Sequence, residues 1–392
     1  AGADAYNIAI GHQAGRDVTT GINNTLVGGT AGDALTTGSY NVALGYDALS
    51  TEDTGTRSIA IGYYALRNQD YDGEANNVAI GHLAGLNVST GIQNTIIGGL
   101  AGDALTTGIN NVAIGYEALS TEDTGSDSTA VGYRALKAQN AASLSNTAVG
   151  KDAGLSLISA SQCVFVGAVA GDAITTGGNN TAIGVSALGA EDEGAGNTVV
   201  GTNALITQDG GDNNTAVGYN AGGDLTTGDS NTLIGQNAGH SGTQNLTTGS
   251  NNVIIGKDAA ASAADRSNEV SIFNGTKTAR FQGSETAWSF VSDARDKSDV
   301  KDLELGIEFV NKLKPRKFKW DYRSTDNDKG KQASGFIAQE IKEVLDNENI
   351  NYTGIVNTND PNQYMIAQAN LVPMLVKAIQ ELSAEVKELK KQ

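Results

Sequence analysis

Fifteen glycines recur at nearly constant spacing along the first two thirds of the chain, and no other feature constrains the fold as strongly. We call them register glycines. They are Gly11, Gly28, Gly45, Gly62, Gly81, Gly98, Gly115, Gly132, Gly150, Gly167, Gly184, Gly201, Gly218, Gly235 and Gly256. Successive gaps are mostly 17 residues, with a few of 18, 19 and 21, and an Ala follows every register glycine by three places. One unit repeated in this way stacks along an axis, so we predict that residues 1–267 form a rod.

The residues that lead into each register glycine have the composition of a strand, as in Asn111-Val112-Ala113-Ile114-Gly115. Successive strand side chains point to opposite faces, so Val112 and Ile114 share one face and Ala113 takes the other. Both faces are apolar in every unit, which is typical of strands buried on both sides. One face can fill the core of a parallel β-solenoid, while the other needs a neighbour. We therefore predict about 17 residues per coil and an oligomer wound about a shared axis.

The rest of each unit reads as corners and turns. Glycine allows the positive φ of a tight corner, and polar turns such as Thr-Thr-Gly follow. Asn stands four places before twelve register glycines, which predicts a ladder of stacked amides. Cys163 replaces one of these Asn residues, so we interpret it as structural. Residues 7–66 and 77–136 are nearly identical, which indicates a super-repeat of four coils.

This pattern resembles the head repeats of YadA-like trimeric adhesins, whose strands also read like Asn-x-Val-Ala-Ile-Gly. The resemblance covers nearly the whole rod and implies left-handed parallel β-rolls assembled as a homotrimer. The unit of this chain is longer than is usual in that family, so the resemblance leaves the cross-section of the coil open.

Composition separates the rod from the rest of the chain. Residues 1–291 hold 10 Lys and Arg against 27 Asp and Glu, whereas residues 292–392 hold 16 against 17. An acidic rod repels phosphates, so we expect no nucleic acid partner and no binding to anionic lipid. No apolar run is long enough for a membrane span, which predicts no membrane insertion. The chain starts at Ala1 without Met, so we expect it to be a fragment of a longer protein.

Few residues of the rod are candidates for binding. One cysteine excludes an internal disulfide, and three scattered histidines predict no metal site and no cofactor. The remaining candidates are the tyrosines after register glycines (Tyr46, Tyr63, Tyr116, Tyr133, Tyr219) and the acidic turns Glu52-Asp53, Glu122-Asp123 and Glu191-Asp192. The alternative is that they are corner packing and solvated loops. Ca²⁺ binding by the acidic turns and ice binding by the Thr-Thr-Gly turns are weaker alternatives.

A junction follows at residues 268–291. The segment that starts at Asn268 predicts a β-hairpin with its turn at Asn274-Gly275. Residues 287–291 then lead into Ser292, and we expect Trp288 and Phe290 to close the end of the rod.

Residues 292–392 predict a compact α+β domain with a candidate catalytic pair. Lys297 lies five residues after Ser292. A lysine whose pKa is lowered by burial can remove the proton of a serine nucleophile, although such a pair alone is common. The surrounding segments closely resemble the peptidase S74 family of intramolecular chaperones found on phage tail spikes and fibres. The matching pieces are Ser292-Asp293-x-Arg295-x-Lys297, Gly306-Ile307, Leu313-Lys314-Pro315, Phe318-Lys319-Trp320 and Gly335-Phe336-Ile337-Ala338-Gln339-Glu340.

The resemblance implies a function for this domain. Members assist trimer folding of the preceding fibre and then cut themselves off before the serine. Carried to this chain, the cleavage site is the bond Val291–Ser292, Ser292 is the nucleophile and Lys297 is the general base. Asp293 and Arg295 match family positions and could support the dyad or be structural only.

The final helix has its own assembly pattern. Val372, Leu375, Ile379, Leu382, Val386 and Leu389 follow alternating steps of three and four residues, which predicts a coiled-coil seam. The alternative is a helix that lies on its own domain.

Together these features predict a phage tail fibre that acts in host attachment and carries a chaperone that cleaves itself once. The resemblance implies a homotrimer in the virion, assembled in the host cytoplasm. Its expected partners are other tail proteins and a host receptor, either a polysaccharide or an outer-membrane protein. A cell-surface trimeric adhesin without enzymatic activity is one alternative. A polysaccharide-degrading tailspike is another, and it would need a groove with paired carboxylates.

Overall fold

The chain consists of two compact units, residues 1–291 and residues 292–392. The computed structural model describes residues 5–141, 145–242, 244–275, 278–282, 289–290, 298–319, 331–358 and 364–391. Among these residues, no helix is both long and apolar enough to span a membrane. Because the two units differ in architecture, each is described by itself.

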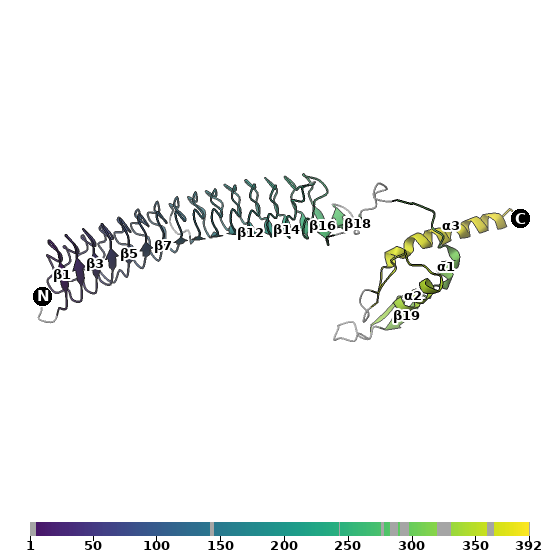
Figure 1. Cartoon of the computed structure of the whole chain (residues 1–392), viewed down its shortest axis with the longest axis horizontal. Coiled ribbons are helices and arrows are strands. Elements are labelled where there is room, and N and C mark those ends of the chain that lie inside the picture. The colour runs from purple at the N-terminus through teal and green to yellow at the C-terminus, as the bar shows by residue number, and fades with distance from the viewer. Residues whose placement is uncertain are drawn as a thin grey trace. The chain divides into compact units, whose positions relative to one another are not determined.

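Fifteen strands of three residues each run through the first unit, one per coil, and the coils stack in a single file (Figure 1). The strands are β1 (Ile8–Ile10), β2 (Thr25–Val27), β3 (Val42–Leu44), β4 (Ile59–Ile61), β5 (Val78–Ile80), β6 (Thr95–Ile97), β7 (Val112–Ile114), β8 (Thr129–Val131), β9 (Thr147–Val149), β10 (Val164–Val166), β11 (Thr181–Ile183), β12 (Thr198–Val200), β13 (Thr215–Val217), β14 (Thr232–Ile234) and β15 (Val253–Ile255). Each pairs in parallel with the next, as Val112 of β7 does with Thr129 of β8. The predicted parallel β-solenoid of about 17 residues per coil is confirmed.

The middle residue of each strand decides which face is inside. Ala113 in β7 and Leu26 in β2 are completely buried, as are the middle residues of all strands from β2 to β15. The two flanking residues point away from the core and are partly or largely exposed, as the burial of Val112 and Ile114 illustrates. The middle residues therefore fill the coil interior, and a second face of mostly aliphatic residues is left on the outside.

The repeated Asn residues form the predicted ladder inside the coils. The Asn41 N–H donates to Asn24 Oδ1 (2.9 Å), and Asn41 Nδ2 donates to the carbonyl of Gly55 (2.8 Å). Buried polar groups need such partners, and here each amide satisfies backbone groups of neighbouring coils. Cys163 occupies a ladder position and is buried and free. Its N–H donates to Asn146 Oδ1 (2.9 Å), and its thiol contacts the carbonyl of Gly177 (3.6 Å), as the side chain of a ladder Asn would.

The register glycines are required by contact between coils as well as by conformation. Gly115 has φ +138°, a value that side chains rarely allow. A Cβ added to Gly115 would lie 2.3 Å from the carbonyl oxygen of Gly132 in the next coil. Each coil therefore rests on the backbone of its neighbour at this corner, and only glycine leaves room for it.

Two kinds of coil alternate in pairs along the solenoid, and they differ in where the large side chain sits. In one kind, Gly stands four places after the register glycine and an aliphatic residue seven places after it, as in Gly102 and Leu105. In the other kind, Leu takes the first position and Glu or Gln the second, as in Leu119 and Glu122. A Cβ on Gly102 would lie 2.9 Å from Leu105 Cδ1. The two leucine positions thus compete for one space in the core.

A short meander ends the solenoid. Its strands are β16 (Glu269–Phe273), β17 (Thr278–Gln282) and β18 (Ser289–Phe290). β16 is parallel to β15, and Glu269 takes the ladder position, where its N–H donates to Asn252 Oδ1 (2.9 Å). The solenoid therefore gains one more coil beyond Gly256 before β17 and β18 turn back antiparallel. Trp288 and the side chain of Phe290, expected to close the rod, lie outside the described residues.

The second unit is a small α+β structure. Its elements are α1 (Ile307–Lys312), β19 (Arg316–Lys319), β20 (Gln332–Gly335), α2 (Ala338–Asn347), β21 (Val356–Asn357), β22 (Met365–Ile366), the 3₁₀ turn η2 (Gln368–Leu371) and α3 (Val372–Leu389). β19 pairs antiparallel with β20, and β21 with β22. One core joins the helices and contains Phe309, Leu313, Ile341, Leu345, Ile355, Leu371 and Met374.

Candidate functional site

The predicted catalytic and cleavage residues lie outside the described residues: Val291, Ser292, Asp293, Arg295 and Lys297. The Ser–Lys dyad and the cleavage site therefore stay predictions from the sequence. Among the described residues, the features that bear on assembly are the surface of α3, a pocket beside it and the outer surface of the rod.

Helix α3 carries two different apolar stripes. One stripe, with Met374 and Ala378, is buried against the core of the second unit. The other is the predicted seam, and all of its residues are exposed: Val372, Leu375, Ile379, Leu382, Val386 and Leu389. Ile379 is 67% exposed and Leu389 is 68% exposed. The helix thus lies on its own domain with one side and leaves a seam of large apolar side chains exposed on the other.

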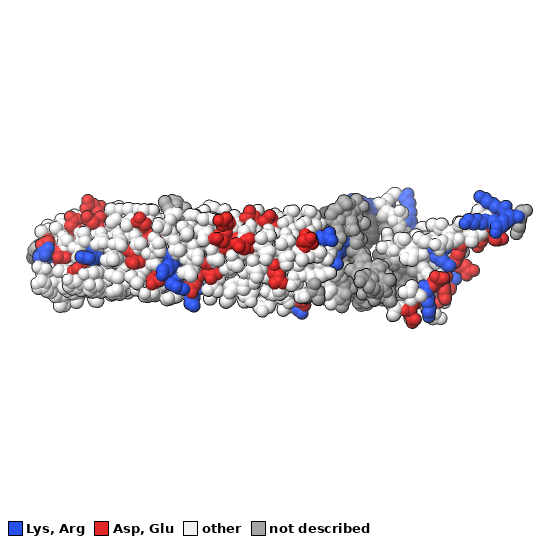
Figure 2. Space-filling model, turned by 90° about the horizontal axis from the view of Figure 1, so that it is seen from above, with Lys and Arg blue, Asp and Glu red and all other residues white. Residues whose placement is uncertain are grey.

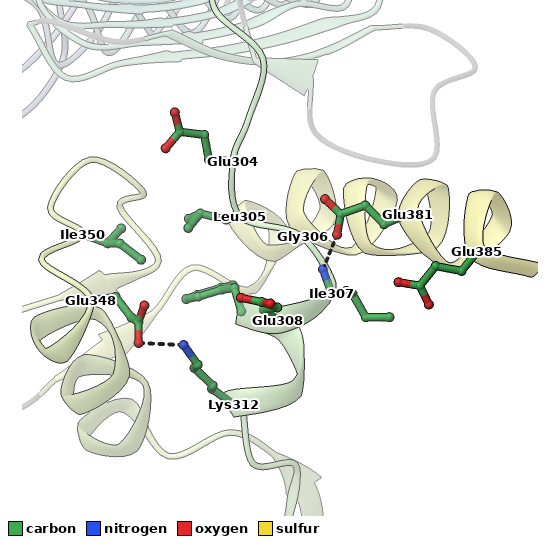
Figure 3. Close-up of a pocket in the computed structure, with 11 residues that line it drawn as sticks. Glu304, Leu305, Gly306, Ile307, Glu308, Lys312, Glu348, Ile350, Glu381 and Glu385 are labelled. Atoms are coloured by element: carbon green, nitrogen blue, oxygen red, sulfur yellow. Dashed lines mark hydrogen bonds and ion pairs between the residues drawn. The ribbon is translucent and has the colours of Figure 1, made fainter. Parts of the chain in front are cut away.

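A pocket of about 330 Å³ lies where α1 meets α3 (Figure 3). Glu381 reaches from α3 to the start of α1, where the Ile307 N–H donates to Glu381 Oε2 (2.7 Å). On the opposite wall, Lys312 Nζ donates to Glu348 Oε1 (2.7 Å). Gly306 is part of this contact, because a Cβ there would lie 2.0 Å from Glu381 Oε2. Of the carboxylates that line the pocket, Glu381 ties α3 to the start of α1, and Glu348 ties the end of α2 to Lys312 of α1.

The rod has an uncovered apolar surface of its own, which we call the strand face. It consists of the first and third residues of strands β1 to β15. All of these residues are Val, Ile, Leu or Thr, and none is charged. Ile10 is 61% and Leu44 46% exposed, and most of the others are partly exposed. A continuous apolar surface of this kind is rare on soluble monomers and typically marks an interaction site.

The acidic turns are divided between the core and the surface. Glu52, Glu122 and Glu191 are completely buried, so their interpretation as part of solvated loops was wrong. The Gly55 N–H donates to Glu52 Oε1 (2.6 Å), and Gln69 Nε2 in the next coil donates to Glu52 Oε2 (2.9 Å). Gln139 and Gln208 contact Glu122 and Glu191 in the same way. Burial raises the pKa of Glu52, and the hydrogen bonds from Gln69, Gly55 and Tyr71 oppose that rise.

A signal for these buried pairs was present in the sequence. Each buried Glu or Gln follows a Leu by three residues, whereas coils with Gly at that earlier position have an aliphatic residue instead. Oxygens of Glu52, Asp53 and Asp70 lie within 4.8 Å of one another. Both carboxylate oxygens of Glu52 already accept hydrogen bonds, so this cluster is accounted for by the Glu–Gln pair.

The candidate tyrosines lie on the outside of the rod. Tyr46, Tyr63, Tyr116, Tyr133 and Tyr219 are all exposed, and four of them stack with a neighbour from an adjacent coil. They are therefore surface residues rather than buried corner packing.

Comparison with known protein families finds one match, and it lies in the second unit. Residues 292–350 match the Peptidase_S74 family, described as chaperone of endosialidase. The match begins at the first residue of the second unit. No curated protein and no solved structure matches the chain.

Proposed function

We propose that this chain is a phage tail fibre whose Peptidase_S74 domain aligns three copies of the rod and then separates from them by cutting the chain. The match of residues 292–350 to the chaperone of endosialidase carries this proposal. The rod would act in the virion as a host-attachment appendage, bound to other tail proteins at one end. Its strand face and the seam of α3 supply the physical reason for assembly.

The strand face favours association of rods side by side. The strand face has thirty positions in fifteen coils, of which twenty-two are Val, Ile or Leu and eight are Thr. Covering it removes aliphatic surface from water, which is the main driving force for protein association. Because the strands are short and regular, three copies can pack these faces around one axis with their coils in register. The YadA-like resemblance of the repeats supports this threefold arrangement.

The charges around the α3 seam favour parallel helices. With Val372, Ile379 and Val386 at position a of the heptad, Glu385 falls at g and Lys390 at the following e. In a parallel coiled coil these positions of neighbouring helices face each other, so opposite charges meet. β-Branched residues at a with Leu at d favour two strands when taken alone. The threefold number therefore rests on the family and the rod, and the mass of the assembly tests it directly.

An assembly domain would help because three rods associate slowly by themselves. Contacts between three solenoids are non-local and form slowly, while uncovered strands are prone to aggregate. Early association through α3 raises the effective concentration of the three rods and sets their register. Cleavage afterwards removes the domain, so the assembled rods stay together because separation is slow.

The proposed cleavage uses the residue directly after the broken bond. Ser292 Oγ attacks the carbonyl carbon of Val291, and Lys297 takes the hydroxyl proton and delivers it to the departing nitrogen. The peptide bond is thereby replaced by an ester between Val291 and Ser292 Oγ. Water then hydrolyses the ester, which leaves the rod ending at Val291 and frees the serine hydroxyl. Each chain carries out this reaction once.

Intact mass spectrometry tests the cleavage, and light scattering tests the assembly. Wild type should yield two fragments that divide at Val291–Ser292. Ser292→Ala and Lys297→Ala should stay as one chain of 392 residues that still forms trimers. Ser298→Ala is the matched control and should be cut like wild type. Cleavage of Ser292→Ala at the wild-type rate would refute the dyad, and a stable monomer or dimer would refute the trimer.

A further inference from the structure

The strand face changes in composition about halfway along the rod. In strands β1 to β7, twelve of its fourteen residues are Val, Ile or Leu, and the other two are Thr25 and Thr95. We call this part the aliphatic half. In strands β8 to β14, which we call the threonine half, six of the fourteen residues are Thr: Thr129, Thr147, Thr181, Thr198, Thr215 and Thr232. Charged side chains are scattered over the surface of the rod in Figure 2, but neither half of the strand face contains one.

The aliphatic side chains also become smaller in the threonine half. The aliphatic half contains eight Ile or Leu residues, whereas the threonine half contains two, Ile183 and Ile234, and its other six aliphatic residues are Val. Each methylene that is removed from water adds to the driving force for association. Thr has nearly the shape of Val but carries a hydroxyl that water binds. Covering the threonine half is therefore less favourable than covering the aliphatic half.

The six threonines form one stripe along the threonine half. Thr129 is the register partner of Thr147 in the next coil, and Thr181, Thr198, Thr215 and Thr232 are register partners in turn. Val164 interrupts the stripe between Thr147 and Thr181. Each of these residues is the first of its strand, so all of their side chains point to the strand face. A shift by one coil brings Thr beside Thr again along most of the stripe, so it does not fix the register of two rods.

The hydroxyls of the stripe have no protein partner within the part of the chain that the structure describes. Threonines of the turns differ in this respect, because Thr36 and Thr106 donate to carbonyls of the next coil (both 3.2 Å). A hydroxyl that is covered without a hydrogen-bond partner lowers stability. A contact that covers the threonine half must therefore keep water between its surfaces or supply other hydroxyls.

We propose that assembled copies of this chain meet through two kinds of contact, a dry one along the aliphatic half and a hydrated one along the threonine half. The strand face continues from one half to the other without a break, since β7 pairs with β8. A further copy that lies parallel on the aliphatic half therefore also faces the threonine half. There it brings its own threonine stripe, and water between the stripes satisfies the hydroxyls of both copies. This inference rests on the proposed assembly and states which part of the rod holds it together.

Cysteine labelling tests the two contacts in the full-length Ser292→Ala protein. Leu44→Cys places a thiol in the aliphatic half and Val217→Cys places one in the threonine half. Leu44 is 46% and Val217 37% exposed in the single chain, so both positions are accessible before assembly. In the assembled protein, iodoacetamide should modify Leu44→Cys about tenfold or more slowly than Val217→Cys, because the reagent enters only a hydrated contact. Thr202→Cys at an exposed corner gives the unprotected rate, and the buried Cys163 gives the background.

Removing the hydroxyls should dry the threonine half. Changing Thr181, Thr198, Thr215 and Thr232 to Val nearly keeps the shape of the side chains. With these changes, Val217→Cys should be protected about as well as Leu44→Cys, since no hydroxyl holds water in the contact. Thr25→Val with Thr95→Val is the matched control in the aliphatic half, and it should leave the rate at Val217→Cys unchanged. Circular dichroism and light scattering verify the fold and the assembly of each variant.

Three results would overturn the hydrated contact, and they differ in what they say of the proposed assembly. Equal protection of the two cysteines in the assembled protein would show one uniform dry contact and leave the assembly intact. A rate at Val217→Cys that the four Val changes do not lower would show that the hydroxyls are not the cause, and would also leave the assembly intact. If both cysteines react as fast as Thr202→Cys, the strand faces do not meet, and the proposed assembly through them fails as well.

Discussion

The rod and the second unit leave apolar surface uncovered in different ways. The rod repeats the same three-residue strand fifteen times, so its strand face is long, regular and made of Val, Ile, Leu and Thr side chains. The second unit builds one compact core from residues far apart in sequence and leaves a single helix stripe of large side chains. The first surface is large but lacks a feature that sets its register, whereas the second is small and carries distinct charges. Under the proposed function, the small surface would start assembly and the large one would maintain it.

The largest expected effect is the loss of stability when a register glycine of the rod is replaced by alanine, compared with the same change at a glycine of the second unit. Gly115→Ala should destabilise the rod by about 4 kcal/mol or more, because it combines an unfavourable φ with a collision against the next coil. Gly354→Ala in the second unit should cost about 1 kcal/mol, since its Cβ would only approach Asn370 Nδ2 at 3.2 Å. Chemical denaturation followed by circular dichroism measures both.

Gly210→Ala is the control within the rod. Its φ is +81°, but nothing lies near the position of the added Cβ. A loss for Gly210→Ala as large as that for Gly115→Ala would show that backbone conformation, rather than contact between coils, explains the register glycines.

The next prediction concerns the start and the maintenance of assembly. In the uncut Ser292→Ala background, Ile379→Asp should leave the protein monomeric, because it places a charge in the short α3 seam. Ile114→Asp changes one of thirty strand-face positions, so the protein should still assemble but melt at a lower temperature. Light scattering and thermal melting distinguish the two. If Ile379→Asp assembles like the parent, α3 does not start assembly.

A smaller effect tests whether the two leucine positions, four and seven places after the register glycine, share one space in the core. Gly102→Leu should overpack the core by about 1–3 kcal/mol, because its side chain competes with Leu105. Combining it with Leu105→Ala moves the leucine to the position that it has in coils such as that of Leu119, and should recover most of the loss. A double-mutant cycle measures this coupling. Simple additivity of the two changes would refute the shared space.

The smallest effect is a difference in the response to acid. The pKa of Glu52 is raised by burial, so its contribution to stability is present below the unfolded value of 4.5 and is lost as the pH rises through the folded value. The pKa of Glu340 is lowered by Arg316, so its contribution is present above the unfolded value and is lost as the pH falls. Acid should therefore favour the coil of Glu52 and weaken the contact of α2 with β19.

Hydrogen exchange at pH 7 and pH 4, corrected for intrinsic rates, measures the two regions in one sample. Glu52→Gln should remove the pH dependence near that coil and leave the second unit unchanged. Greater protection near Glu52 at neutral pH than at pH 4 would contradict the assigned direction.

The sequence predicted the solenoid, the Asn ladder and the seam of α3, but it did not predict the buried Glu–Gln pairs. The glycine spacing predicts the solenoid and the Asn ladder because each depends on neighbours at a constant sequence distance. The seam of α3 follows from heptad spacing alone. The buried Glu–Gln pairs were missed because a Glu beside Asp and Thr reads as a solvated turn. Their burial depends on a leucine three residues earlier and on a glutamine in the next coil.

By itself, the sequence determined the periodic architecture of the rod, because that architecture depends on spacing along the chain. The roles of Ser292 and Lys297 stay predictions that the family resemblance implies. The sequence also showed that strands such as Val112–Ile114 are apolar on both sides. Only the tertiary structure decided which side is inside. Because alternate strand side chains point to opposite faces and only one face meets the core, Ala113 is buried while Val112 and Ile114 are left outside.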